Sequence, residues 1–155
     1  MERFRLWLPR VLLAVYALVM LWLLFGQRLG MPPVASYWES VRWSLNLVPF
    51  RTIGEYVKIL LDPPMAYLLR HAVINLAGNV AMFVPLGVLL PWVFPRLRRL
   101  SRCLLAALGL LVLVEVTQLF TLLGSGDVDD LILNLLGVLL GYALFRLAAR
   151  LRRRT

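Results

Sequence analysis

The apolar positions of the chain form four long runs separated by shorter stretches rich in polar residues. The runs extend over residues 7–25, 72–93, 103–123 and 131–149. Each approaches the roughly 20 apolar residues that an α-helix needs to cross the hydrocarbon core of a bilayer. The pattern therefore predicts an all-α membrane protein with four transmembrane helices, and we expect residues 1–155 to form a single membrane domain.

The first run follows a basic stretch, as the apolar core of a secretory signal peptide also does. No small-x-small cleavage pattern comes after it, because the run ends in Gly26, Gln27 and Arg28. We therefore expect this run to be retained as the first span.

Residues 33–70, between the first two runs, show a different pattern. Apolar residues recur at helical spacing over residues 52–61, and the sequence Asp62-Pro63-Pro64 ends the repeat. Trp38 and Trp43 have the amphipathic rings that favour the membrane–water boundary. The region is thus expected to contain an amphipathic helix lying on the membrane surface.

The amino-acid composition supports a membrane protein and argues against several other classes of protein. The chain is 61% hydrophobic with a mean hydropathy of +0.82, whereas soluble domains are about 45–50% apolar. The net charge of +9 comes from arginines that flank the apolar runs, so we interpret it as topogenic and expect no nucleic-acid partner. A single cysteine, Cys103, excludes an intramolecular disulfide and a cysteine-rich metal site.

Basic residues gather at alternate ends of the runs. Twelve of the 17 Lys and Arg residues lie before or at the start of the first run, between the second and third, or at the end of the fourth and after it. Positively charged segments stay in the cytoplasm. We therefore expect both termini in the cytoplasm, and residues 26–70 and 124–130 outside.

This orientation gives the polar residues of the spans a common depth. Glu115 should lie about eight residues, or ~12 Å at 1.5 Å per residue, below the outer end of the third run. The other strongly polar residues also fall in the outer half of the bilayer. The full candidate binding set is Asn75, Asn79, Glu115, Gln118, Asp127, Asp129, Asp130 and Asn134.

The helical faces are consistent with this depth. Asn75 and Asn79 are spaced by four residues, and the fourth run carries a stripe that continues to Gly137 and Gly141. Small residues spaced by four let transmembrane helices approach closely. The sequence thus predicts a polar pocket between helices that opens to the outside.

Each polar group also has a structural interpretation. Glu115 could line a pocket or hold a hydrogen-bonded network, and intramembrane acids usually mark function. The amides are common contacts between helices. The three aspartates could hold a cation, or cap the fourth helix; capping should occupy no more than one of them. His71 is more simply an interfacial side chain than a catalytic base.

Four motifs in order resemble the VanZ-like family, and together they cover roughly residues 46–141. They are Asn46-x-x-Pro49-Phe50, then Asn75-x-x-Gly78-Asn79-x-x-x-Phe83-x-Pro85-x-Gly87, then Glu115-x-x-Gln118, and finally Asp127-x-Asp129-Asp130-x-x-x-Asn134-x-x-Gly137-x-x-x-Gly141.

The resemblance implies a small multi-pass protein of the bacterial cytoplasmic membrane. Founding members are associated with low-level resistance to teicoplanin, a lipid-bearing glycopeptide, and no catalytic mechanism comes with the family. The chain departs from the family pattern at Gly124, where many members carry an arginine. If that arginine neutralises the carboxylates, Arg51, Arg70 or another outer base must replace it here.

Two functional hypotheses follow. The first is a non-enzymatic protein that binds membrane lipid, a lipid-linked cell-wall precursor or a lipoglycopeptide in the outer pocket, with no cofactor and no bound metal. The second is an intramembrane hydrolase or transferase acting on a lipid phosphate, in which Glu115 is a general base and the aspartates hold a divalent ion. A role as accessory subunit of a cell-envelope complex also stays open.

Overall fold

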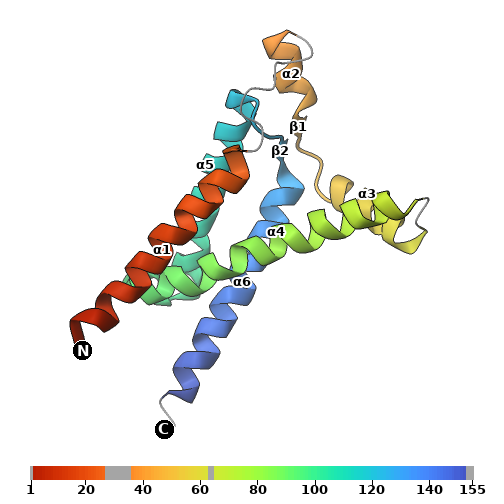
Figure 1. Cartoon of the computed structure of the whole chain (residues 1–155). Coiled ribbons are helices and arrows are strands. Elements are labelled where there is room, and N and C mark those ends of the chain that lie inside the picture. Colours follow the sequence, from red (N-terminus) through yellow and green to blue (C-terminus); the bar gives the residue numbers. More distant parts are fainter. Residues whose placement is uncertain (1, 27–35, 63–64, 153–155) are drawn as a thin grey trace.

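The structure is a computed structural model that describes residues 2–26, 36–62 and 65–152, with side chains from residue 7 onward (Figure 1). Residues 33–35 and 63–64 of the predicted interfacial region, and Arg28, lie outside this part. The elements in chain order are α1 (Glu2–Phe25), α2 (Tyr37–Trp43), β1 (Leu45–Asn46), α3 (Arg51–Leu61), α4 (Ala66–Val93), η2 (Pro95–Arg98), α5 (Leu100–Thr121), β2 (Gly126–Asp127) and α6 (Val128–Leu151).

The all-α membrane architecture is confirmed. In the described part of the chain, four helical segments are long and apolar enough to cross a membrane: Trp7–Phe25, Ala66–Val93, Leu100–Thr121 and Val128–Leu151. Their outward surfaces are apolar, with Leu18 68% and Leu113 63% exposed, as expected for helices whose solvent is lipid. The second span begins earlier than predicted, because its helix already starts at Ala66 and includes Arg70 and His71.

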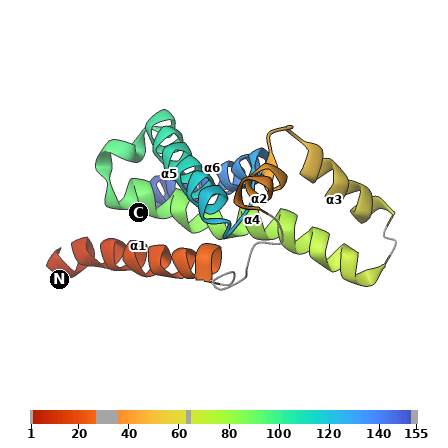
Figure 2. The ribbon, with the colours of Figure 1, turned by 90° about the horizontal axis from the view of Figure 1, so that it is seen from above.

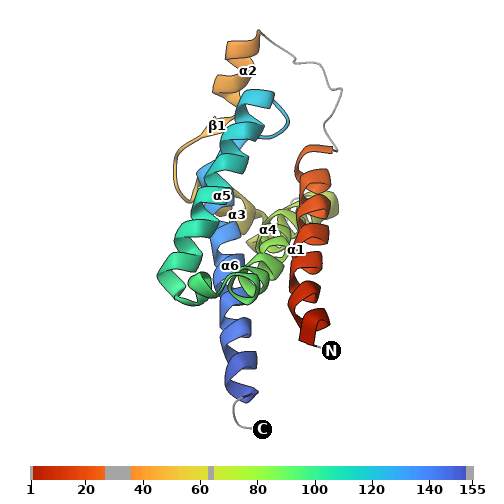
Figure 3. The ribbon, with the colours of Figure 1, turned by 90° about the vertical axis from the view of Figure 1, so that its left-hand side faces the viewer.

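The core lies where α4 and α6 cross, and all four spans contribute to it (Figures 1 and 3). α1 adds Met20, α4 adds Phe83 and Leu90, α5 adds Leu111, and α6 adds Val138. Figure 2 shows α1 beside one end of α4 and α3 beside the other. The long helix α4 therefore connects the two sides of the molecule.

Glycines allow α4 and α6 to meet backbone to backbone. A Cβ atom on Gly137 or Gly141 would overlap the carbonyl oxygen of Val80 or Val84, and a Cβ on Gly87 would overlap that of Val138. The close approach predicted from this stripe is confirmed. Gly78 is different, since a Cβ there would meet only the Ile74 methyl at 4.0 Å.

The region between the first two spans contains more structure than predicted. A helix does cover residues 52–61, as α3, and its C-cap is Asp62. The short helix α2 and the two-residue strand β1 were not predicted. β1 pairs in parallel with β2, so that Leu45 lies opposite Gly126 and Asn46 opposite Asp127. The N- and C-termini lie at the end of the molecule opposite α2 (Figure 1); their cytoplasmic location and the interfacial position of α3 stay predictions.

Candidate functional site

Asp127 joins three segments at the end of the molecule that carries α2, which we call the outer end after the predicted orientation. It is the last residue of β2 and the N-cap of α6, and its Oδ1 accepts a hydrogen bond from the Asp129 backbone N–H at 2.9 Å. The same oxygen accepts from the Asn46 amide at 3.2 Å, and Oδ2 accepts from the Thr52 hydroxyl at 2.7 Å. A buried carboxylate is stable only when such donors surround it, and here the donors come from β1, α3 and α6.

Asp129 caps a helix other than its own. Its side chain is fully buried; Oδ1 accepts from the Phe50 N–H at 2.5 Å and Oδ2 from the Ile53 N–H at 2.9 Å. Phe50 is the N-cap of α3 and has a left-handed backbone with φ 63°, which costs a non-glycine residue about 1–3 kcal/mol. The two charge-assisted bonds offset that cost and satisfy two N–H groups at the start of α3.

The third aspartate connects α6 to α4. The Asn79 amide donates to Asp130 Oδ1 at 2.7 Å. On the neighbouring helix α3, partial burial and then the carboxylates of Asp130, Asp127 and Glu55 raise the pKa of the Tyr56 phenol. The aspartates therefore act on the Tyr56 phenol of α3 through their charge as well as on the position of that helix.

One aspartate caps the fourth helix, as expected, but a second one caps α3, which was not predicted. Asp127 caps α6, and Asp129 caps α3 through the Phe50 and Ile53 N–H groups. The sequence offered no sign of the second cap because its donors lie 79 and 76 residues away. Asp127 and Asp129 are thus engaged by protein donors on both carboxylate oxygens.

Glu115 is buried on α5, with 8% of its surface exposed. Its Oε2 accepts a hydrogen bond from the Asp127 N–H at 3.3 Å. A cavity of about 160 Å³ adjoins this carboxylate, between α5, β1 and the start of α6. Its other walls are largely apolar, and they include Leu45, Leu119 and Leu131.

The remaining predicted residues do not converge on this cavity. Asn75 donates to the His71 carbonyl of its own helix at 2.9 Å, although the four-residue spacing suggested that it would join Asn79. Gln118 donates to the Leu24 carbonyl of α1 at 2.9 Å. Asn134 is 5% exposed, and its Oδ1 has no partner among the described residues. In the described part of the chain, the cavity beside Glu115 is lined by none of Asn79, Gln118 and Asn134.

Gly124 and the outer bases also differ from expectation. A Cβ atom on Gly124 would lie 2.8 Å from Gln118 Cβ, so an arginine there would require the Gln118 side chain to move. Arg51, proposed as a substitute base, lies 3.6 Å from Glu55 in an exposed ion pair. In this chain, N–H, amide and hydroxyl donors surround Asp127 and Asp129.

Within the described residues, no three or more His, Cys, Asp or Glu side chains are arranged to hold a metal ion. The hydrogen bonds of Asp127, Asp129 and Asp130 form a polar hub that holds α3, α4 and α6 together. A small cavity adjoins this hub at Glu115. Sequence reasoning missed Thr52 as a member of this hub. The motif Asn46-x-x-Pro49-Phe50 was the available signal, because it places polar and turn-forming residues directly before α3.

Comparisons with known proteins agree with this architecture. The family model described as VanZ/LLP1 matches residues 13–149. Protein VanZ of Enterococcus faecium is 30% identical over 142 residues, which are 91% of this chain and 75% of that protein. No solved structure matches the chain. The family match and the relative both extend across the spans and the polar hub, and the chain therefore belongs to the VanZ/LLP1 family.

Proposed function

We propose that this VanZ/LLP1 membrane protein binds an amphiphilic cell-envelope ligand at its outer end and thereby contributes to resistance against teicoplanin-type glycopeptides. The ligand class is a lipid-linked cell-wall component or a lipoglycopeptide. The proposal places the protein in the bacterial cytoplasmic membrane with both termini inside, which the asymmetric distribution of arginines supports.

The observation that carries the proposal is the cavity beside Glu115. A carboxylate placed among leucine and valine side chains can accept a hydrogen bond from a polar group while the walls contact an acyl chain. Oε2 accepts a hydrogen bond from the Asp127 N–H, so the proposal assigns the ligand donor to Oε1. Because about 160 Å³ is smaller than the ~300–1,000 Å³ of whole-ligand sites, the cavity would hold one end of an acyl chain, with the headgroup outside.

The surrounding hub supports this assignment. Asp129 fixes the start of α3, and Asp127 fixes β1 against β2. Exposed apolar side chains continue from the cavity onto the outer region, including Leu47 at 68% and Phe50 at 65% exposure. A rigid platform of this kind lowers the entropy lost on binding.

Two substitutions test the cavity, each with a matched control. Glu115→Gln replaces the carboxyl group with an amide, and Glu55→Gln makes the same change at an exposed position on α3. Leu119→Trp fills the cavity, and Leu113→Trp adds the same bulk on a lipid-facing part of α5. The variants are expressed at equal membrane levels in a susceptible host, and teicoplanin inhibitory concentration and co-purifying lipid are measured.

We expect Glu115→Gln and Leu119→Trp to lose the protection and the co-purifying lipid, while both controls behave as the parent. Folding is checked by size-exclusion chromatography, so that loss of function is compared only among folded proteins. The proposal is wrong if the folded cavity variants match the parent in both assays. It also fails if cells with the parent protein are as susceptible as cells without it.

A further inference from the structure

A second cavity, larger than the one beside Glu115, lies at the end of the molecule away from the polar hub, which we call the inner end. It has a volume of about 690 Å³ and lies between the inner halves of α4 and α6, beneath η2. Its volume is within the ~300–1,000 Å³ typical of sites for small molecules. None of the residues discussed for the outer end lines it.

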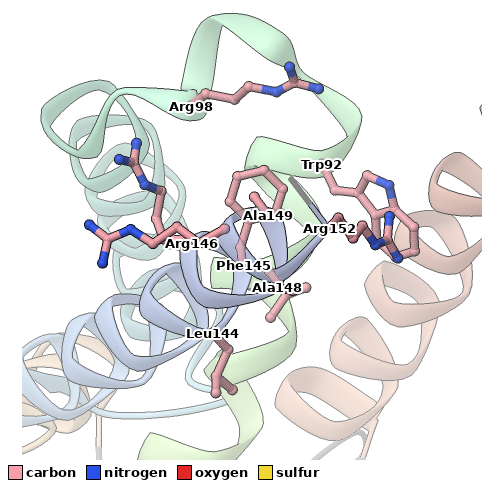
Figure 4. Close-up of a pocket in the computed structure, with 10 residues that line it drawn as sticks. Trp92, Arg98, Leu144, Phe145, Arg146, Ala148, Ala149 and Arg152 are labelled. Atoms are coloured by element: carbon pink, nitrogen blue, oxygen red, sulfur yellow. The ribbon is translucent and has the colours of Figure 1, made fainter. Parts of the chain in front are cut away.

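Four arginines line this cavity and no acidic residue does: Arg98, Arg146, Arg150 and Arg152. Figure 4 shows Arg98 coming from the segment that joins α4 to α5, and Arg146 and Arg152 coming from α6. Arginines from two elements thus line one cavity. Their exposed side chains point to different sides of it in Figure 4, and the Arg98 Nε–H donates to the Pro91 carbonyl at 3.4 Å. Several cations around one cavity repel one another, and an anion placed among them removes that repulsion.

The elements that carry these arginines are held together. The hydroxyl of Tyr142, a buried residue of α6, donates to the Arg98 carbonyl at 2.6 Å. This bond holds η2 against α6, so the backbone positions that carry Arg98 and Arg146 keep their spacing. A fixed backbone spacing lowers the conformational entropy lost when the two side chains gather around an anion.

The other walls of the cavity are apolar and partly exposed. Trp92 and Phe145 are half-buried, and Leu144 is 52% exposed on the surface of a membrane-spanning helix. A tryptophan at the end of a span is typical of the headgroup level of a bilayer. The cavity thus combines a guanidinium cluster for phosphate with a surface for acyl chains, and a free phosphate would use only the first.

We propose that this cavity binds the phosphate headgroup of an anionic phospholipid from the leaflet at the end where the two termini lie. Guanidinium groups form paired hydrogen bonds to phosphate oxygens, and basic pockets between transmembrane helices suit such headgroups. Four arginines exceed what one phosphate needs, so a lipid with two phosphates binds more tightly than a lipid with one.

The test uses the purified full-length chain, stripped of lipid in a neutral detergent. Native mass spectrometry and thermal stabilisation measure binding of cardiolipin with two phosphates, phosphatidylglycerol with one, zwitterionic phosphatidylethanolamine, and inorganic phosphate. We expect affinity to fall in that order, with no displacement of cardiolipin by millimolar inorganic phosphate.

Two pairs of variants locate the site. Arg98→Gln/Arg146→Gln removes two charges from the cavity, whereas Arg99→Gln/Arg102→Gln removes two charges at the same end from residues that do not line it. The first pair is expected to lose about tenfold in cardiolipin affinity, and the second to stay within about twofold. Ala148→Trp fills the cavity with all arginines kept and should also lose binding, while Ala143→Trp, elsewhere on α6, should not.

Several results would overturn the proposal. Equal losses from the two arginine pairs would mean diffuse attraction without a site. Parent-like binding by Ala148→Trp would place the lipid elsewhere. Equal affinity for phosphatidylethanolamine would exclude recognition of net charge, and displacement by inorganic phosphate would indicate a site for a free anion. If the arginine variants fail to fold, the comparison of Ala148→Trp with Ala143→Trp still tests whether lipid binds in the cavity.

Discussion

The two ends of this membrane protein use charge in opposite ways. At the outer end, buried carboxylates accept hydrogen bonds from neighbouring segments, and the cavity beside them measures about 160 Å³. At the inner end, four arginines surround a cavity of about 690 Å³ with no acidic side chain in its lining. The carboxylates at the outer end are bonded to neighbouring segments, while the arginines at the inner end are exposed around a cavity. Both ends of the molecule carry charged residues. The role of such a residue therefore has to be inferred from its hydrogen-bond partners and not from its charge alone.

The glycine contact between α4 and α6 links the two ends, and breaking it should cause the largest loss in the free energy of unfolding. Gly141→Ala places a Cβ atom against the Val84 carbonyl and separates α4 from α6. We expect a loss of about 3 kcal/mol in the free energy of unfolding, measured by SDS titration in mixed micelles. Gly109→Ala is the control, because nothing lies within 4 Å of the added atom on α5. Similar losses for the two variants would mean that the glycine contact does not hold the spans together.

Removing the aspartate that caps α3 should destabilise the outer end by a smaller amount and leave the inner end unchanged. Asp129→Ala leaves the Phe50 and Ile53 N–H groups without their acceptor, which should cost about 2 kcal/mol and expose α3 to protease. Asp62→Ala, at the exposed C-terminal end of α3, should change neither. Lipid binding at the inner cavity should survive in Asp129→Ala. If α3 stays protected in that variant, the carboxylate is not what holds it.

The smallest effect is expected at the inner end. In detergent without lipid, Arg98→Gln/Arg146→Gln should change the free energy of unfolding by no more than about 0.5 kcal/mol, because both side chains are exposed. The same SDS titration measures this, with Asp129→Ala as the destabilised reference. A loss as large as that of Asp129→Ala would contradict the contrast between the two ends.

Much of the fold could be predicted from the sequence because it depends on local patterns. The four apolar runs gave the spans, the helical repeat gave α3, and the spacing of Gly137 and Gly141 indicated close packing. Depth arguments also placed Asn79, Asp127 and Asp130 at one end, and two of these, Asn79 and Asp130, do form a direct contact.

The rest depends on contacts between distant residues. A two-residue strand has no periodicity, so β1 becomes recognisable only when β2 lies beside it. Asn75 has the right spacing to join Asn79, yet it bonds within its own helix. The arginines of the inner cavity were interpreted as topogenic, since a count of charges does not show that several of them line one cavity.

The cap on α3 also has a consequence for the order in which the protein is made. Asp129 lies 79 residues after Phe50, so a ribosome adding ~5–20 residues per second takes about 4–16 s to supply it. Until then the start of α3 lacks its acceptors and β1 lacks its partner strand. The outer region therefore settles only when the last helical hairpin has entered the membrane, and insertion of that hairpin completes the assembly of an earlier part of the chain.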